Sequence, residues 1–559
     1  MVNKSIFAAY LVYLLVTGAV TYAAPITQDQ YNQQQTSKRQ AEEQTSRITS
    51  PSAQSKRKVH IGDFVVLPKE PYRFKINVIQ IDTGKTSRFT WLNKELEKYE
   101  GRLIGAQGIN ALHKMLVEKL VARGFITTRV VVPEQNLKTG KLVFKIIPGY
   151  IKDIKFENPK TFGTWKTAFP TKPGDILNVR NIEQGIEQMK RVPNQNVEVS
   201  LQSGKEENQS IVVLKVKRSK MWSIGMSYDD GGLESTGRHQ ATGNVALYNP
   251  TGLNDIFSYN YTKDAEHKDA AFGTKNYSFS YSVPYKNYTF NINKYYGEFY
   301  EQVPAFIPFE SRGKTTTWDF GVQRLLYRDN IRKTQALVKV IKRRKESYID
   351  GEEIKVQRLN TAAYQLGLMH RQYIGEGIFD GMVYYQKGVP WFGAEPGIDD
   401  FTKGIMTTRY SLVGLNLYYG TPFLLGNIKA MYSFTFRGQY TKDALYGSDQ
   451  FSIGGRYTVR GFSGNNTLAA ENGYIARNEI SFPFTKVNME PYLGVDYGRV
   501  WGPSDEYLWG NSLAGGVIGI RGKLAKDVNY DVFIGTPIYK PQGFKAGKTA
   551  CGFNLYWQI

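Results

Sequence analysis

The amino-acid sequence predicts a membrane β-barrel of about sixteen antiparallel strands, preceded by two small α+β domains and an N-terminal helix with its linker. From residue 219 onward, aromatic and branched side chains alternate with Ser, Thr and Asn, as in strands with one face toward lipid and one toward water. Residues 72–218 show one order of elements twice. After the N-terminal segment no apolar run reaches about 18 residues, the length that a spanning helix needs.

Composition and charge agree with this class. The 559 residues include 38 Tyr and 54 Gly, and the formal net charge is +22. Abundant Tyr is typical of the aromatic girdles of membrane barrels. A strongly basic chain suits nucleic acid, anionic lipopolysaccharide or a charged lumen. The sequence contains no recognisable nucleic-acid-binding module, and the basic cluster 341–346 lies within an alternating segment, so we favour a basic barrel rim or lumen.

The N-terminus has the pattern of a secretory signal peptide. Lys4 is the charged start, residues 6–19 are apolar, and Thr21 and Ala23 are small residues at the cleavage positions. We therefore predict a signal peptide at residues 1–23. The alternative is a membrane anchor, which the short apolar run disfavours.

Residues 24–58 form a polar, Gln-rich segment. Residues 33–47 can form a polar helix that Pro51 would end, although such a helix is marginal alone in water. A disordered leader is the alternative interpretation.

Two consecutive units, residues 72–148 and 149–218, share a β-α-α-β-β order. In the first we predict strands and a main helix at 74–79, 112–121, 127–132 and 142–147. In the second we predict strands and helices at 151–156, 165–169, 180–191, 197–201 and 211–216. Such a domain leaves a strand edge and a helix exposed, and an extended client segment can add itself to that edge as another strand.

Residues 219–559 contain the strand candidates of the barrel, and their even number is typical of bacterial barrels. Tyr432 and Phe434, for example, alternate with Ser433 and Thr435. The longest connection spans residues 441–471. A loop of this length without secondary structure of its own is usually functional.

Arg460 lies in a glycine-rich stretch, residues 451–466, within that loop. Glycines allow the close backbone approach that folding back into a cavity requires. A buried guanidinium needs a carboxylate, and Asp496 lies on a strand-like segment, facing away from Leu493 and Val495. We therefore predict an Arg460–Asp496 pair. The alternative is a hairpin loop with a surface arginine.

Three motifs in this region resemble the core of two-partner secretion transporters, which include transporters of the haemolysin-activator, contact-dependent-inhibition and filamentous-adhesin types. These belong to the superfamily of outer-membrane barrels with POTRA (polypeptide-transport-associated) domains. The motifs are Val459-Arg460-Gly461-Phe462, the stretch 473–479, and Gly494-Val-Asp496-Tyr-Gly498. The resemblance implies that loop 441–471 lies in the barrel lumen, that its Arg meets the wall Asp, and that residues 24–58 form a lumenal plug helix and linker.

The resemblance extends to the two α+β units, which are similar to the two POTRA domains of this family. It is carried by residues 122–129 and 132–140 in the first unit and by 168–170 and 174–189 in the second. Within these motifs, the candidate substrate-binding residues are Gln135, Arg180, Gln184 and Gln188.

The function implied by the resemblance is transport in the bacterial outer membrane, with the POTRA domains in the periplasm. They would receive one large exoprotein, which the barrel would pass outward unfolded and without nucleotide. Expected partners are this exoprotein (an adhesin, a haemolysin or a contact-dependent toxin) and outer-membrane lipid or lipopolysaccharide, and no nucleic acid. One alternative is a barrel assembly factor, which usually has more POTRA domains. Another is a passive porin or adhesin barrel.

We predict no catalytic, cofactor-binding or metal-binding residue, and therefore no enzyme. The five His show no paired spacing, the Gly pairs follow no phosphate-loop pattern, and no Ser sits in a nucleophile elbow. An outer-membrane protease or lipase barrel is the alternative enzyme class. The single cysteine, Cys551, cannot form an intrachain disulfide, so packing or lipid contact explains it better.

Overall fold

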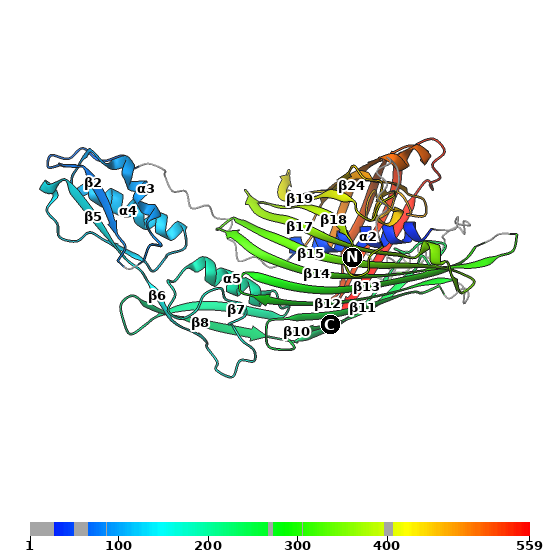
Figure 1. Cartoon of the computed structure of the whole chain (residues 1–559), viewed down its shortest axis with the longest axis horizontal. Helices are drawn as coiled ribbons and strands as arrows, with labels where there is room; N and C mark the ends of the chain where they lie inside the picture. Colours follow the sequence, from blue (N-terminus) through cyan, green and yellow to red (C-terminus); the bar gives the residue numbers. More distant parts are fainter. Residues whose placement is uncertain (1–26, 50–64, 85, 267–271, 304–305, 396–405) are drawn as a thin grey trace.

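The computed structural model describes residues 27–49, 65–84, 86–266, 272–303, 306–395 and 406–559. A large barrel contains the N-terminal helix α2 (Gln28–Thr49), and two α+β domains extend from one end of the barrel (Figure 1). The predicted signal peptide and the linker that follows residue 49 lie outside the described residues. Among the described residues, no helix is both long and apolar enough to cross a membrane.

The first α+β domain packs two helices on small sheets. Its elements are β1 (Phe74–Ile76), β2 (Val78–Asp82), α3 (Trp91–Leu96), η1 (Glu97–Tyr99), β3 (Arg102–Ile104), α4 (Ala106–Ala122), β4 (Arg129–Val131), η2 (Leu137–Thr139) and β5 (Lys141–Ile147). The predicted strand 74–79 is divided, because β1 pairs with β3 whereas β2 pairs with β5. Leu112, Leu116 and Leu120 repeat along α4 and lie in the core, as the helical period predicts.

The second domain is a three-stranded sheet covered by one helix. Its elements are β6 (Tyr150–Phe156), α5 (Val179–Lys190), β7 (Gln195–Ser203) and β8 (Gln209–Arg218), and the strand order is β6-β8-β7. The helix predicted at 165–169 is wrong: these residues form a turn that places Phe169 in the core beneath α5. Asn178 caps α5 by accepting a hydrogen bond from the Arg180 backbone NH.

The barrel closes through pairing of its last strand with its first, and the predicted fold class is confirmed. Among the described residues it has sixteen long antiparallel strands, with the two-residue β16 (Glu352–Glu353) as a hairpin extension of β15. The strands are β9 (Trp222–Asp229), β10 (Gln240–Tyr248), β11 (Ile256–Asp264), β12 (Gly273–Tyr285), β13 (Tyr288–Val303), β14 (Phe309–Arg328), β15 (Arg332–Ile349), β17 (Leu359–Ile374), β18 (Gly377–Val389), β19 (Ser411–Leu425), β20 (Ile428–Thr441), β23 (Asn472–Ser481), β24 (Met489–Trp501), β25 (Ser512–Ala525), β26 (Val528–Tyr539) and β27 (Ala550–Gln558).

Side chains alternate between the two faces of the barrel wall, as the sequence pattern predicts. On β24, Leu493, Val495 and Tyr497 are exposed on the outside, whereas Asp496 is fully buried on the inside. Cys551, near the start of β27, is exposed. It faces outward, because the side chain of Asn554 lines the interior cavity three residues further on.

Candidate functional site

The connection between β20 and β23 folds into the barrel and packs on the inner wall. It was predicted to lack secondary structure, but it contains η4 (Gly447–Asp449) and the short paired strands β21 (Phe451–Ile453) and β22 (Leu468–Ala470). Val459 and Phe462 of the predicted motif are buried against wall residues such as Leu513. The Phe462 ring also meets Phe544 edge-on, with 5.9 Å between centroids.

Arg460 reaches Asp496 on β24, as the sequence predicts. Its Nε and Nη2 donate to the two Asp496 carboxylate oxygens at 2.8 and 2.9 Å, and its backbone NH donates to the same carboxylate at 2.9 Å. Burial on its own lowers the pKa of the Arg460 guanidinium, but the hydrogen bonds and charges of Asp496 and of Glu479 together outweigh burial and raise it above its ordinary value. The ion pair therefore fixes the loop to the wall in its charged form.

The pair belongs to a larger network that sequence reasoning missed. Arg460 Nη1 also pairs with Glu479 on β23. The second oxygen of Glu479 accepts from Arg521 on β25 at 2.9 Å. Arg477 lies 3.6 Å from the Asp496 carboxylate. Glu479 stands in the recognised stretch 473–479, but only the pairing of β23 with β24 shows that its side chain converges on Arg460.

Glycines allow the loop and the wall to approach this closely. A Cβ at Gly494 would lie 2.6 Å from Arg460 Nη2, and one at Gly498 would lie 2.8 Å from Val459 Cγ2. Gly461 has a φ of +105°, and a Cβ there would lie 2.6 Å from the Thr536 carbonyl oxygen. The predicted motif glycines thus mark the contacts between the loop and the wall.

Helix α2 occupies the lumen and runs along the barrel. Its first residue, Gln28, donates to the carbonyls of Lys314 and Glu346, at the end of the barrel away from the α+β domains. Near its other end, Arg47 pairs with Asp380 at 3.2 Å. With 22 residues, α2 is about 33 Å long, close to the thickness of a membrane.

Polar contacts hold α2 in place. Amide side chains donate to carbonyls of the barrel and of the loop, namely Gln33 to Gly447, Gln34 to Gly231 and Gln44 to Leu417, at 2.7–3.1 Å. Tyr31 contributes the main apolar contact by packing on Phe299. Cavities of about 600 Å³ and about 540 Å³ lie along the helix. Along α2 the lumen is therefore filled by a polar helix with cavities beside it.

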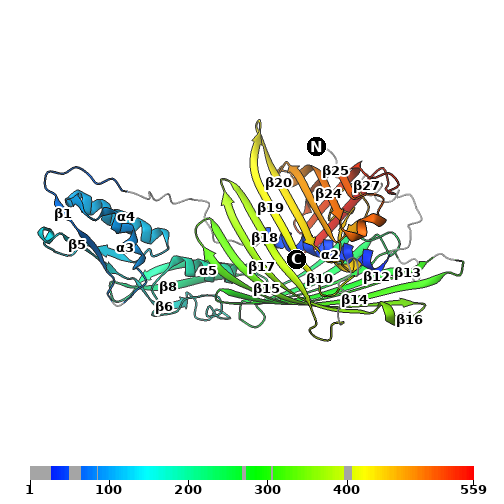
Figure 2. The same cartoon turned by 45° about the horizontal axis from the view of Figure 1, so that its top comes forward.

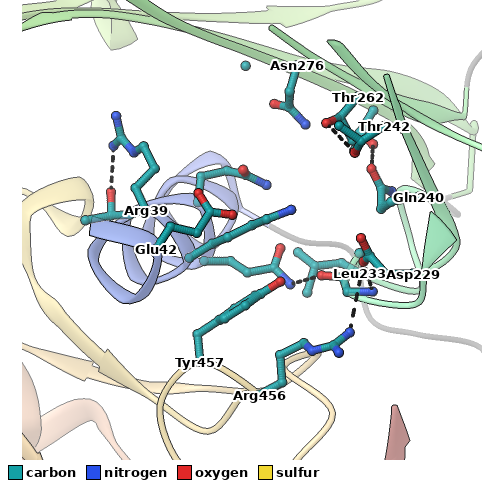
Figure 3. A pocket seen from close by; sticks show the side chains of 18 of the residues that line it. Arg39, Glu42, Asp229, Leu233, Gln240, Thr242, Thr262, Asn276, Arg456 and Tyr457 are labelled. Carbon is teal, nitrogen blue, oxygen red and sulfur yellow. Dashed lines mark hydrogen bonds and ion pairs between the residues drawn. The ribbon is translucent and has the colours of Figure 1, made fainter. Parts of the chain in front are cut away.

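The loop tip and the helix meet beside the larger cavity. Figure 3 shows Tyr457 of the loop beside α2 and its neighbour Arg456 extended toward Asp229 of β9. Arg456 pairs with Asp230 at 3.0 Å. Arg437 of β20 donates both to the Ser37 carbonyl of α2, at 3.1 Å, and to the Tyr457 carbonyl of the loop. One wall arginine thus contacts both lumenal elements.

The second α+β domain docks on the barrel through α5. Figures 1 and 2 show this helix beside the ends of the neighbouring barrel strands. Gln184 and Gln188 donate to the Lys286 carbonyl at 3.4 and 3.3 Å, and Gln188 also donates to Thr289 at 3.2 Å. The helix that we expected to be exposed is therefore covered on this side. The substrate-binding role of these two glutamines stays a prediction.

Glu187 provides the charged contact of this interface. Its carboxylate accepts from Arg328 at 2.7 Å and from Lys333, on strands β14 and β15. Burial on its own raises the pKa of Glu187, but the two cations outweigh burial and lower it to about 2. Sequence analysis does not single out Glu187, because a Glu on an amphipathic helix has the same sequence pattern as an acid that faces solvent.

The other two candidate substrate-binding residues make local contacts. The side-chain amide of Gln135 accepts from the Val143 backbone NH of β5 at 2.7 Å and donates to the Val143 carbonyl at 3.0 Å. It therefore makes the hydrogen bonds that a further strand beside β5 would make. Arg180 forms an ion pair with Glu183 and lies near the Ala122 carbonyl of the first domain. Across the residues that the structure describes, His, Cys, Asp and Glu form no group of three that could hold a metal ion.

Comparison with known proteins identifies the chain. Residues 208–522 match the family described as haemolysin secretion/activation protein ShlB/FhaC/HecB. The chain belongs to this family. Residues 74–149 match the ShlB-type POTRA domain, and residues 150–203 match a further POTRA domain. The two α+β domains are thus POTRA 1 and POTRA 2.

Relatives and solved structures agree. Outer membrane transporter CdiB-2 of Burkholderia pseudomallei (strain 1026b) is 38% identical over 556 residues, covering 96% of this chain and 95% of the relative. Hemolysin transporter protein ShlB of Serratia marcescens is 26% identical over 419 residues, covering 73% of this chain and 72% of the relative. CdiB from Acinetobacter baumannii superposes with a TM-score of 0.83 at 26% identity, covering 96% of this chain and 100% of that structure. CdiB from Escherichia coli, at 21% identity and a TM-score of 0.84, shows the same fold over 96% of this chain and 100% of that structure.

The predicted family, outer-membrane location and transporter function are therefore confirmed. The POTRA domains lie in the periplasm, so the barrel end that contacts α5 is the periplasmic end. Gln28 of α2 lies toward the cell exterior. Transporters of this family work with a large secreted exoprotein.

Proposed function

We propose that this transporter captures one large exoprotein with its POTRA domains and passes it unfolded through the barrel, without nucleotide. The observation that supports this most is the lumen itself. It is closed by a helix and a loop that polar contacts hold in place, and it is lined by polar side chains from many strands.

The size of the lumenal helix suits a polypeptide client. An α-helix with its side chains is about 10–12 Å across. An extended chain occupies about 5 Å in the hydrogen-bonding direction and about 10 Å across its side chains. Withdrawal of α2 would therefore make room for one extended segment and not for a folded domain.

Withdrawal of the helix requires its polar contacts with the barrel and the loop to be exchanged for contacts with water or with the client. Five amide-to-carbonyl hydrogen bonds attach Gln28, Gln33, Gln34 and Gln44 to the barrel and the loop. At about 0.5–1.5 kcal/mol net for each bond, they contribute roughly 2.5–7.5 kcal/mol. Holding the helix in place costs conformational entropy that offsets part of this. The ion pairs Arg47–Asp380 and Asp29–Lys345 add to this attachment. Sequential contacts with the client would therefore replace these contacts one after another and not all at once.

We assign client capture to the outer edge of β7 in POTRA 2. In the described part of the chain, β7 pairs only with β8, so its other edge remains available for an added strand. In POTRA 1 the outer edge of β2, the counterpart of β6, is blocked, because Glu100 and Asn93 accept from its Ile79 and Ile81 backbone NH groups. β7 begins beside the barrel, where Gln195 lies 3.5 Å from Asn254. A client strand on β7 would thus extend to the barrel mouth.

The proposed partners are an exoprotein of the type that CdiB transporters export, because the 38% identical relative has that name, and outer-membrane lipopolysaccharide. We propose neither a nucleic-acid partner nor an enzymatic activity. A haemolysin-like client is the second candidate, because the relatives also include haemolysin transporters.

Site-specific crosslinking of a stalled client tests the route. Asn293 lines the lumen, and its neighbour Ile292 faces lipid, so a photo-crosslinker at these two positions forms a matched pair. We expect client adducts at position 293 and none at 292. Export without any adduct at 293 would contradict a lumenal route. Loss of many outer-membrane proteins on depletion of the transporter would instead support an assembly factor.

A further inference from the structure

Three residues form a continuous row across the outer face of the barrel. In the strand register, Lys294 of β13 is opposite Trp318 of β14, and Trp318 is opposite Lys342 of β15. Lys294 Nζ lies 5.1 Å from the Trp318 ring centroid and 5.5 Å from that of Tyr277. Each outer member of the row is a cation, and the middle member is an indole.

The row points out of the barrel. The adjacent side chains of Asn293, Thr317 and Arg343 line the lumenal cavities, and successive side chains of a strand face opposite sides. Phe320, two residues along from Trp318, is 48% exposed on the outside.

The row lies in the outer half of the apolar belt. Lys294 and Trp318 are each six residues from Tyr288 and Arg324, which are opposite each other near the periplasmic ends of β13 and β14. At about 3.3 Å per residue and a tilt of about 40°, six residues rise about 15 Å, of the roughly 25 Å height of the apolar band in such barrels. From this height a lysine extends its ammonium group along the barrel wall toward the headgroups of the outer leaflet.

The two lysines are not neutralised by acids. Among the described residues, no carboxylate lies within ion-pair distance of Lys294 or Lys342. Higher on the same strands, Arg312 pairs with Glu298 and Arg344 pairs with Glu346. Outward cations are also concentrated in this sector. In the halves of the strands toward the cell exterior, β12–β15 carry six, whereas the outward positions of β9 and β10 carry none; the six are Lys275, Lys294, Arg312, Lys314, Lys342 and Arg344.

We propose that this row is a binding site for a diphosphorylated glycolipid of the outer leaflet. Lys294 and Lys342 lie two strand spacings apart, about 10 Å, and each binds one phosphate. The Trp318 ring between them contacts the sugar, because indole rings suit the boundary between apolar and polar lipid. The inference rests on the lipopolysaccharide partner of the proposed function and gives that partner a location.

Lipid binding to the whole protein tests this proposal. The probe is diphosphorylated lipid A, added to delipidated transporter in detergent and measured by native mass spectrometry. At about 1 kcal/mol for each cation, the double variant K294Q/K342Q is expected to lose affinity roughly 25-fold. Lys387→Gln is the matched control, because Lys387 also faces outward but donates to Ser411 on another sector. This control should leave affinity unchanged.

Two further binding measurements identify the ligand. Fully dephosphorylated lipid A should bind the unaltered protein as weakly as the diphosphorylated form binds the double variant. Unchanged binding by the double variant, equal binding of both lipids, or displacement by inorganic phosphate would each overturn the proposal. A heat-modifiability gel confirms that the variants are folded. Client export is measured in the same variants, so loss of lipid binding alone is distinguishable from failure of the transport function.

Discussion

Arg460→Ala is expected to release the lumenal loop from the wall while the barrel still assembles. The substitution removes both guanidinium hydrogen bonds to Asp496, a side chain with 0% exposure, and leaves it only the backbone NH of residue 460 and Arg477 at 3.6 Å. Removing one partner of a buried ion pair costs about 3–5 kcal/mol. Arg477 offsets part of the lost charge of Arg460, so we take about 3 kcal/mol, the lower end of this range, as the cost. It corresponds to an approximately hundredfold rise in the released population.

The released population can be measured by cysteine labelling. Val459 is fully buried in the loop, and the single native cysteine is exposed. Val459→Cys in a Cys551→Ser background is therefore labelled by maleimide only when the loop opens. Adding Arg460→Ala should raise the labelling rate about a hundredfold and cripple export. The matched control is Arg499→Ala, an exposed arginine on the same strand as Asp496. Wild-type labelling together with full export in Arg460→Ala would refute the reasoning.

Three further outcomes are expected. Deleting residues 27–49 should raise single-channel conductance in a planar bilayer, and unchanged conductance would show that α2 does not close the lumen. Gly515→Ala should displace the loop and reduce export, because the added Cβ would overlap the Arg460 carbonyl, whereas Gly243→Ala meets no atom within 4 Å and should be silent in the same export assay. Docking of POTRA 2 should depend on pH through Glu187. Its pKa is lowered from 4.5 to about 2, so its contribution is fully present above pH 4.5 and is lost as pH falls toward 2. Glu187→Gln should abolish the pH dependence of crosslinking between POTRA 2 and the barrel. If this variant keeps the wild-type pH profile, the Glu187 carboxylate is not the cause of the dependence.

The sequence contained enough information for the barrel and for one ion pair. Alternation of side chains such as Tyr432, Ser433 and Phe434 is a local signal, so the strand number was predictable without knowledge of the register. Arg460 and Asp496 were predictable because a charge among glycines and an acid on an apolar strand are each conspicuous.

The remaining contacts depend on three-dimensional placement. Glu479 approaches Arg460 only because β23 pairs with β24 in one particular register. Glu187 meets Arg328 across 141 residues of sequence, and no local pattern distinguishes a docked acid from a solvated one. The prediction of a helix at 165–169 is wrong for a related reason. Phe169 packs in the POTRA 2 core, and a turn at these residues places it there.

The direction of α2 has a consequence for repeated rounds of export. Its C-terminal end lies toward the periplasm, and residues 50–64 join it covalently to POTRA 1. Those fifteen residues can span at most about 50 Å. A helix that a client displaces would therefore stay tethered near the periplasmic opening of the barrel. Its effective concentration at that opening would be in the millimolar range. Resealing is then a first-order event whose speed does not depend on how many transporters the cell contains.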